Sequence, residues 1–309
     1  MIKSLLTLIL VILSAGTIYA GTGETGFAFL KIGIGGRSAG MGETATASST
    51  DASAAFWNPA GLIQSNSHDV IFTYNRWIAG IQHNFGSAKF VYGKNAFALH
   101  YISTGMDDIE QRDIPSENPT AYFSSHDLAL GISYARKMND RLSLGMTGKY
   151  IYEHIQSSVS AFAIDLGAWY DIQYTYDNPD KDRRWRVGLT LTNLGFSDKF
   201  VNEKVILPTA IRLGSVYHIL PQTASGNTWL VAADIEKPLA ENLRTHLGTE
   251  YGYKNTYFVR AGYQWGYEAR GVSAGIGIKI RRVTIDYGYM PFSNSLGTTH
   301  RISAALAFE

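Results

Sequence analysis

Few residues of this 309-residue chain are spaced as a catalytic or metal-binding site requires. Gly21-Thr-Gly-Glu-Thr-Gly26 matches the glycine pattern of dinucleotide-binding loops, but such a loop follows a strand and opens a helix, and the sequence indicates neither here. The eight histidines are scattered, without the paired spacing that zinc sites use. The absence of cysteine excludes disulfides and thiolate metal sites. We therefore expect no catalytic residues, no metal and no cofactor.

Charged residues do recur in a regular way, alternating with apolar ones. In Val283-Thr-Ile-Asp-Tyr-Gly-Tyr289, the odd positions are apolar or aromatic and the even ones are small or polar. Successive side chains on a strand point to opposite faces, so this strand has one apolar and one polar face. The charged residues predicted to share the polar, lumen-facing side are Lys149, Asp165, Arg186, Arg212, Asp234, Glu236, Arg244, Glu250, Arg260, Lys279 and Asp286.

These inward charges carry both signs, which argues against a strongly ion-selective pore. Two interpretations stay open. The charges form the wall of a polar channel, or they pair with one another and simply fill the interior. We favour mutual pairing.

The alternation recurs in fourteen stretches between Asp69 and Glu309. Their number is even and their lengths suit tilted strands that cross a bilayer. Only a closed barrel satisfies every backbone amide and carbonyl of such strands. The sequence therefore predicts an all-β fold, a 14-stranded antiparallel transmembrane β-barrel over 69–309. The predicted strands are 69–77, 80–92, 95–106, 125–137, 141–155, 160–172, 184–195, 209–219, 228–237, 243–253, 257–267, 271–280, 283–291 and 299–308.

Residues 1–20 have the composition of a cleaved signal peptide. A basic start, an apolar core over Leu5–Leu13 and Ala20 at the cut are typical of export signals. We expect the cell outer membrane of a Gram-negative-type bacterium as the location and its lipid as a partner. The formal net charge of +1 gives no electrostatic reason to expect nucleic acid.

Residues 21–68 belong neither to the signal peptide nor to the barrel. They are predicted to form an N-terminal hatch, or plug, that enters the lumen from the periplasmic side. Asp51 is a good N-cap for a short alanine-rich helix, and Pro59 should end that helix at Trp57 or Asn58. Trp57, Asn58, Pro59 and Gly61 should form a compact turn, with Trp57 packed on the inner wall. Residues 38–47 are a candidate for one additional strand.

Turn lengths predict the orientation. If Glu309 is periplasmic, short links such as Arg281-Arg282 and Asn139-Asp140 are periplasmic too, and the longer links 107–124 and 196–208 face outside, as is usual for such barrels. The links 173–183 and 220–227 are long for periplasmic turns. The charged run in 173–183 is either a solvated loop or a place where a periplasmic partner docks.

Three pieces of the N-terminal segment carry a family resemblance. They are Phe29-Leu-Lys-Ile-Gly33, Gly36-Arg-Ser-Ala-Gly-Met-Gly-Glu43 and Asp51-Ala-Ser-Ala-Ala-Phe-Trp-Asn-Pro-Ala-Gly-Leu62, followed by Asn75-Arg-Trp-Ile-Ala-Gly-Ile-Gln-His-Asn84. Together they resemble the PorV/PorQ family of outer-membrane proteins, within a superfamily that includes the FadL fatty-acid transporters. The resemblance implies a fourteen-stranded barrel with a hatch, serving type IX secretion and surface attachment.

Two functions compete on this basis. The leading hypothesis is a non-enzymatic subunit in protein secretion or surface attachment, whose partners are secretion or attachment-complex proteins. The alternative is a FadL-like channel for hydrophobic small molecules, which should contain a continuous apolar pocket. An outer-membrane phospholipase or protease with residues dispersed over several strands is a third, less favoured reading.

Overall fold

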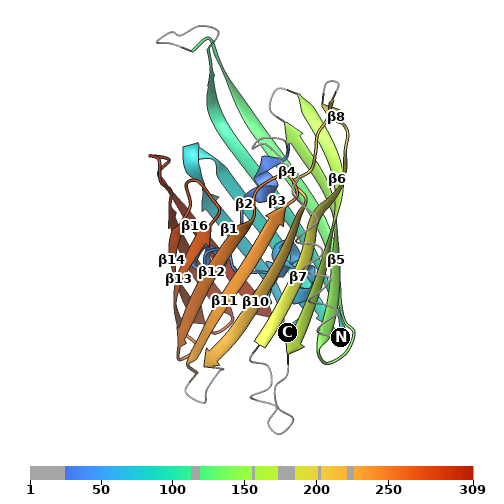
Figure 1. Cartoon of the computed structure of the whole chain (residues 1–309), viewed down its shortest axis with the longest axis vertical. Helices are drawn as coiled ribbons and strands as arrows, with labels where there is room; N and C mark the ends of the chain where they lie inside the picture. Colours follow the sequence, from blue (N-terminus) through green and yellow to red (C-terminus); the bar gives the residue numbers. More distant parts are fainter. Residues whose placement is uncertain are drawn as a thin grey trace.

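Fourteen antiparallel strands close into one barrel in the computed structural model (Figure 1). The structure describes residues 25–112, 119–154, 157–172, 185–200, 203–220 and 226–308. The predicted signal peptide and the link 173–183 lie outside these residues. The strands of the wall are β1 (His68–Arg76), β2 (Gln82–Tyr92), β3 (Asn95–Gln111), β4 (Ala121–Lys137), β5 (Leu142–His154), β6 (Ser158–Ile172), β7 (Trp185–Ser197), β10 (Ala210–Leu220), β11 (Thr228–Pro238), β12 (Arg244–Tyr253), β13 (Tyr257–Trp265), β14 (Val272–Ile280), β15 (Val283–Pro291) and β16 (Thr298–Phe308).

The predicted barrel is confirmed. The first and last strands close it, with His68 opposite Phe308 and Arg76 opposite His300. Strand boundaries agree closely with the predicted ones, except that β3 continues to Gln111 and β4 begins at Ala121. A separate two-stranded ribbon, β8 (Lys199–Phe200) with β9 (Glu203–Lys204), lies in the link between β7 and β10.

Side chains alternate in exposure along each strand, as a barrel in lipid requires. On β14, Val272 and Ile276 are each 60% exposed, while Ser273 between them is buried. The outer surface is therefore apolar, and the polar positions turn inward. No helix in the described part of the chain is both long and apolar enough to cross a membrane.

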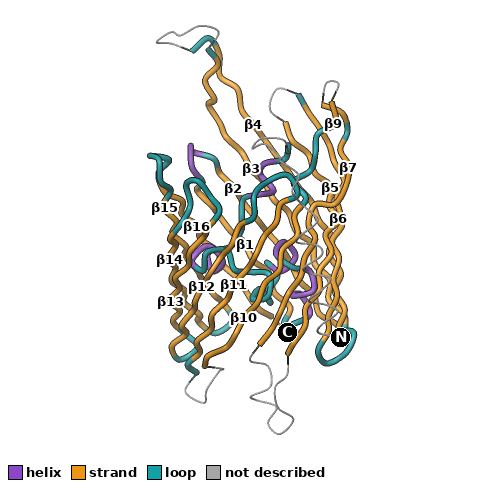
Figure 2. The backbone as a smooth tube through the Cα atoms, viewed as in Figure 1, coloured by secondary structure: helices purple, strands orange, loops and turns teal. Residues whose placement is uncertain are grey.

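The inside of the barrel is occupied by the hatch, described from Thr25 to Ser67 (Figure 2). Its helices are η1 (Ala28–Lys31), α2 (Gly36–Gly40), α3 (Ala54–Trp57) and η2 (Pro59–Ile63). Helix α2 packs against β13, β14, β15 and β16, while η2 packs against β2 to β6. The two halves of the hatch therefore contact opposite sides of the wall.

Two local predictions for the hatch are wrong. Residues 38–47 form the end of α2 and a series of turns instead of a strand, because Gly42 and Glu43 have positive φ angles of 64° and 63° that interrupt extended backbone. The N-cap of α3 is Ser53 instead of Asp51. Asp51 instead accepts the backbone N–H of Ser53 at 3.0 Å, which forms a turn before the helix. The helix does end at Trp57.

The barrel has two rims that differ in shape. The C-terminal rim carries the C-terminal end of β16 and the short turns at 93–94, 254–256 and 281–282. The opposite rim carries the long β3–β4 hairpin, which rises above the rest of the wall, and is called the hairpin rim here (Figure 1).

Within the described residues, the path of the hatch differs from the expected one. The backbone N–H of Gly26 donates to the carbonyl of Ile206 at 3.1 Å, and Ile206 lies in the link at the hairpin rim. The described hatch thus begins at the hairpin rim and descends through the lumen to His68 at the C-terminal rim. The sequence contains no local signal for this direction, because the two contacting segments are about 180 residues apart.

Candidate functional site: the hatch and the wall around it

The turn after α3 is fixed to the wall by one side chain. Asn58 is fully buried, and its amide nitrogen donates to the carbonyls of Thr46 at 2.8 Å and of Ala168 on β6 at 3.1 Å. Its oxygen accepts the N–H of Ala60 at 3.1 Å, which caps η2 behind Pro59. Asn58 therefore joins two parts of the hatch to each other and to the wall.

The neighbouring Trp57 contacts the wall through its ring. The guanidinium of Arg212 on β10 lies 5.0 Å from the centre of that ring, a cation–π geometry. Trp57 is 5% exposed. Gly61 allows the chain to pass closely over the earlier hatch, since a Cβ there would stand 2.3 Å from the carbonyl oxygen of Ser49.

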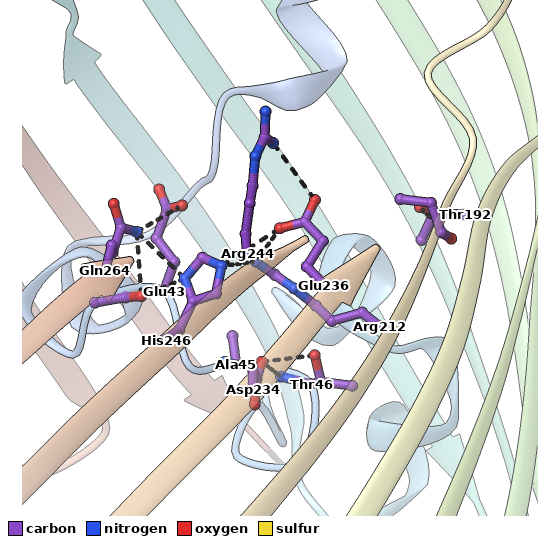
Figure 3. Close-up of polar contacts among 12 residues, drawn as sticks. Glu43, Ala45, Thr46, Thr192, Arg212, Asp234, Glu236, Arg244, His246 and Gln264 are labelled. Carbon is purple, nitrogen blue, oxygen red and sulfur yellow. Dashed lines mark hydrogen bonds and ion pairs between the residues drawn. The ribbon is translucent and has the colours of Figure 1, made fainter. Parts of the chain in front are cut away.

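A second fixation point is Asp234, which projects inward from β11 (Figure 3). One of its carboxylate oxygens accepts the N–H of Ala45 at 3.1 Å, and the N–H and hydroxyl of Thr46 at 3.0 and 2.7 Å. All three residues are buried. Hydrogen bonds to a carboxylate are stronger than bonds between neutral groups, so this contact holds the middle of the hatch on the β11 wall.

Glu43 is the charged centre of the hatch, and the sequence analysis did not single it out. Its carboxylate lies 2.6 Å from Arg301 on β16 and 3.7 Å from Arg270, in the link between β13 and β14. Gln264 donates to it at 3.2 Å. Burial opposes its ionisation, but Arg301 and Arg270 outweigh that cost and hold the pKa of Glu43 at about 2. The hatch therefore carries a buried negative charge.

Beside Glu43 lies a cluster formed by Arg212, Glu236, Arg244 and His246 (Figure 3). Glu236 is 2.8 Å from Arg212 and 3.9 Å from Arg244. The Nδ1 atom of His246 donates to the carbonyl of Gly42 at 2.8 Å. The predicted charges of this cluster thus contact one another, and His246 beside them contacts the hatch backbone.

Toward the C-terminal rim of the barrel, Arg37 of α2 forms a second ionic chain with the wall. Its Nε atom lies 2.8 Å from Glu250 on β12. Glu250 is also 2.6 Å from Arg260 on β13, which is 2.8 Å from Asp286 on β15. Charges of both signs alternate along this chain, so it neutralises itself.

The remaining predicted charges are placed as follows. Lys149 on β5 pairs with Asp165 on β6 at 2.8 Å, and Arg186 on β7 lies 3.5 Å from Asp171. Lys279 on β14 borders the cavity at the C-terminal rim. Each charged side chain predicted to face the lumen is buried or half-buried. Most are paired, so the geometry favours a filled interior over an open polar channel.

Inward-facing glycines bring the wall close to the hatch backbone. A Cβ at Gly262 would stand 2.1 Å from the nitrogen of Gly42, and one at Gly248 would stand 2.3 Å from the carbonyl of Met41. Similar clashes with hatch atoms within 3.0 Å would occur at Gly145, Gly167, Gly188, Gly214, Gly275 and Gly288. We call these eight residues the glycine belt. The glycine belt shows that the wall can carry no side chain where it contacts the hatch backbone.

Cavities lie on both sides of the hatch. The cavity on the hairpin-rim side has a volume of about 80 Å³, and the one on the C-terminal-rim side about 380 Å³. They share no lining residue. Charged residues line both, including Lys31 and Glu241 above and Arg37 and Asp51 below.

In the described part of the chain, no group of three or more His, Cys, Asp or Glu residues could hold a metal. The sequence contains two Gly-x-Ser-x-Gly patterns, around Ser38 and Ser273. The hydroxyl of Ser38 donates to the carbonyls of Ile34 and Gly35, just before α2, and that of Ser273 accepts the N–H of Gly42. Both hydroxyls therefore make contacts within the hatch or between the hatch and the wall.

The fold resembles those of several solved outer-membrane channels. The toluene transporter TbuX of Ralstonia pickettii is 15% identical, with a TM-score of 0.56 over 89% of this chain and 97% of its own. A TodX deltaS2S3 mutant, a monoaromatic hydrocarbon channel, is 14% identical, with a TM-score of 0.60 over 89% and 98%. A Pseudomonas aeruginosa FadL homologue is 12% identical, with a TM-score of 0.56 over 90% and 98%. At these identities, the likeness is one of fold.

No curated protein sequence matches this chain. A family model does, over residues 20–241, and its description is type IX secretion system protein PorV. This match covers most of the chain, and together with the closed barrel it locates the protein in the outer membrane. The chain therefore belongs to the family of the type IX secretion system protein PorV.

Proposed function

We propose that this protein is a non-enzymatic outer-membrane subunit of a type IX-like system, acting in the secretion of proteins or their attachment to the cell surface. It reaches the membrane after removal of the signal peptide at residues 1–20. Its partners are other secretion or attachment proteins, and it meets them through surfaces outside the lumen.

The observation that carries this proposal is the closure of the lumen. Asp234, Glu43 and Arg37 fix the hatch to the wall on one side, and Asn58 fixes it on the other. The cavities of about 80 and 380 Å³ on its two sides have no lining residue in common. A barrel closed in this way is suited to presenting surfaces to other proteins, since a conducting barrel needs a path through its centre.

A FadL-like channel for hydrophobic small molecules is the second candidate. Its support is the fold, which matches hydrocarbon channels at TM-scores near 0.6. Pockets for hydrophobic ligands are lined mainly by apolar and aromatic side chains. The larger cavity instead borders on Arg37, Arg260 and Asp286. Transport would require the hatch to release several buried ion pairs, which makes this candidate less favoured.

Deleting the gene in its native host separates the two candidates. For a secretion subunit, we expect specific proteins to disappear from the cell surface and the medium, measured by quantitative proteomics. Uptake of labelled toluene and long-chain fatty acid should stay unchanged, and the intact gene should restore secretion. Unchanged secretion together with lost uptake would establish the channel instead.

A further inference from the structure

The β3–β4 hairpin forms a two-stranded ribbon beyond the barrel wall (Figure 1). On one side, β2 pairs with β3 only as far as Gly105, and on the other, β5 pairs with β4 only from His126 onward. Among the described residues, Met106–Gln111 and Ala121–Ser125 therefore pair only with each other. At about 3.3 Å per residue, the β3 part of the ribbon spans roughly 20 Å. Within the described part of the chain, neither outer edge of the ribbon pairs with a further strand.

The β3 edge has the features by which proteins protect a free edge. The register shifts between Met106 and Ile109, which places an extra residue on β3 and makes a bulge. Its sequence also carries the carboxylates Asp107, Asp108 and Glu110. Bulges and charges both discourage another strand from pairing.

The β4 edge has neither feature. Ala121-Tyr-Phe-Ser-Ser125 contains no charged residue and no proline, and the extra residue of the bulge belongs to the other strand. Tyr122 is 61% exposed, and Phe123 on the opposite face is half-buried. An unprotected edge of this kind is a template for strand addition.

We propose that Ala121–Ser125 is a docking edge that binds an extended segment of a secreted protein as a third strand of the ribbon. This inference rests on the proposed secretion function and specifies how its partner is held. The edge selects for backbone shape, because only an extended chain matches its row of amides and carbonyls. One edge can therefore serve many secreted sequences.

Two further properties of the ribbon fit this occupant. An isolated two-stranded ribbon is only marginally stable in water, so a third strand stabilises it. The apolar faces of Tyr122 and Phe123 give the incoming strand side-chain contacts on both faces, since cross-strand pairs stabilise sheets. Glu110 is paired with Arg112, whereas the exposed carboxylate of Asp107 lies one strand away and favours lysine or arginine in the bound segment.

Amide hydrogen exchange tests the docking edge directly. The purified barrel is mixed with one purified secreted protein whose release into the medium depends on this chain. We expect exchange to slow by about tenfold or more at 121–125 and to stay unchanged at 106–111, as a closed ladder protects its amides. Binding without protection at 121–125, or with protection on the β3 edge instead, overturns the proposal.

Matched lysine substitutions test it in cells. Ser124→Lys places a charge on the open edge, while Glu110→Lys places one on the edge that is already protected. We expect Ser124→Lys to reduce secretion about tenfold and Glu110→Lys to leave it near wild type, because an edge charge opposes strand addition. Equal secretion by the two variants contradicts the inference. Ser124→Thr should behave as wild type.

The outcomes separate the two proposals. If deleting the whole gene leaves secretion intact, the proposed function itself fails. If deletion stops secretion but Ser124→Lys does not, only the docking edge fails.

A chain with a single Ser124→Cys also tests self-association, since the natural sequence has no cysteine. A disulfide-linked dimer of that variant would identify a second copy of this chain as the occupant and overturn the proposal.

Discussion

Asp234 in the wall accepts hydrogen bonds from both the backbone N–H and the hydroxyl of Thr46 in the hatch. The same carboxylate oxygen also accepts the N–H of Ala45. A single wall residue thus satisfies three buried donors of the hatch. Because the described helices of the hatch are only four or five residues long, contacts of this kind determine whether it stays in place.

Replacing Asp234 with alanine should therefore loosen the hatch. The lost acceptor leaves buried donors unpaired, at a cost of about 1–3 kcal/mol. We expect earlier thermal unfolding in detergent, measured by the mobility change of heated barrels on gels, and larger conductance in planar bilayers. Asp234→Asn keeps an acceptor and should lie between wild type and Asp234→Ala. Glu110→Ala, at an exposed position on the ribbon, serves as the control. An Asp234→Ala barrel that stays closed and fully stable would contradict the assigned role.

The glycine belt makes a steric prediction. Gly262→Ala places a methyl group 2.1 Å from the nitrogen of Gly42, a distance that forces the backbone to move. We expect poor assembly, or a barrel whose hatch is cut by added protease. Gly148→Ala on β5 is a matched control, since nothing lies within 4 Å of its added methyl group. If both variants assemble equally well and resist protease equally, the hatch is not packed against the belt.

The barrel was predictable because its information is local. Each strand repeats every two residues, so Val283–Tyr289 already shows which side chains face inward. Residues such as Asp286 and Arg260 were assigned to the lumen for that reason. The pairing between them was not predictable, because which strands lie side by side at one level depends on the register of the whole wall.

The hatch was predictable only in part. The turn around Asn58 follows from Pro59, a local signal. Glu43 has no periodic neighbours and acquires its role from Arg301, more than 250 positions away. The same holds for Gly26 and its contact with Ile206. Irregular segments that fill a lumen take their conformation from the wall, so their own sequence does not specify their path.

Asn58→Ala combined with Pro59→Ala separates a structural turn from a functional one. Asn58 makes three hydrogen bonds, so we expect a destabilised hatch. Barrel assembly, bilayer conductance and secretion should be measured on the same strain. Normal assembly without a new leak, but with lost secretion, assigns the turn a functional role. Loss of assembly or a new leak alone means that the turn only holds the hatch.

Glu43 makes the hatch sensitive to acid. Its pKa is lowered from 4.5 to about 2, because the cost of burial is outweighed by Arg301 and Arg270. A lowered pKa contributes stability that is complete above pH 4.5 and is lost as the pH falls toward 2. We expect thermal stability to decline over that window in wild type. Glu43→Gln should be less stable at pH 7 and show a weaker decline. An equally steep decline in the variant would assign the acid sensitivity to other carboxylates.

The orientation of the barrel can be tested with single cysteines, since the natural chain has none. Arg282 lies in a turn at the C-terminal rim, and Leu296, 46% exposed, lies in a link at the hairpin rim. With the C-terminal rim in the periplasm, a membrane-impermeant maleimide added to intact cells should label Leu296→Cys and leave Arg282→Cys unlabelled. Both should react after the outer membrane is permeabilised, which controls for assembly and accessibility. Labelling of Arg282→Cys on intact cells, with protection of Leu296→Cys, would invert the barrel. The open edge at Ala121–Ser125 would then face the periplasm and could meet secreted proteins only before they cross the membrane.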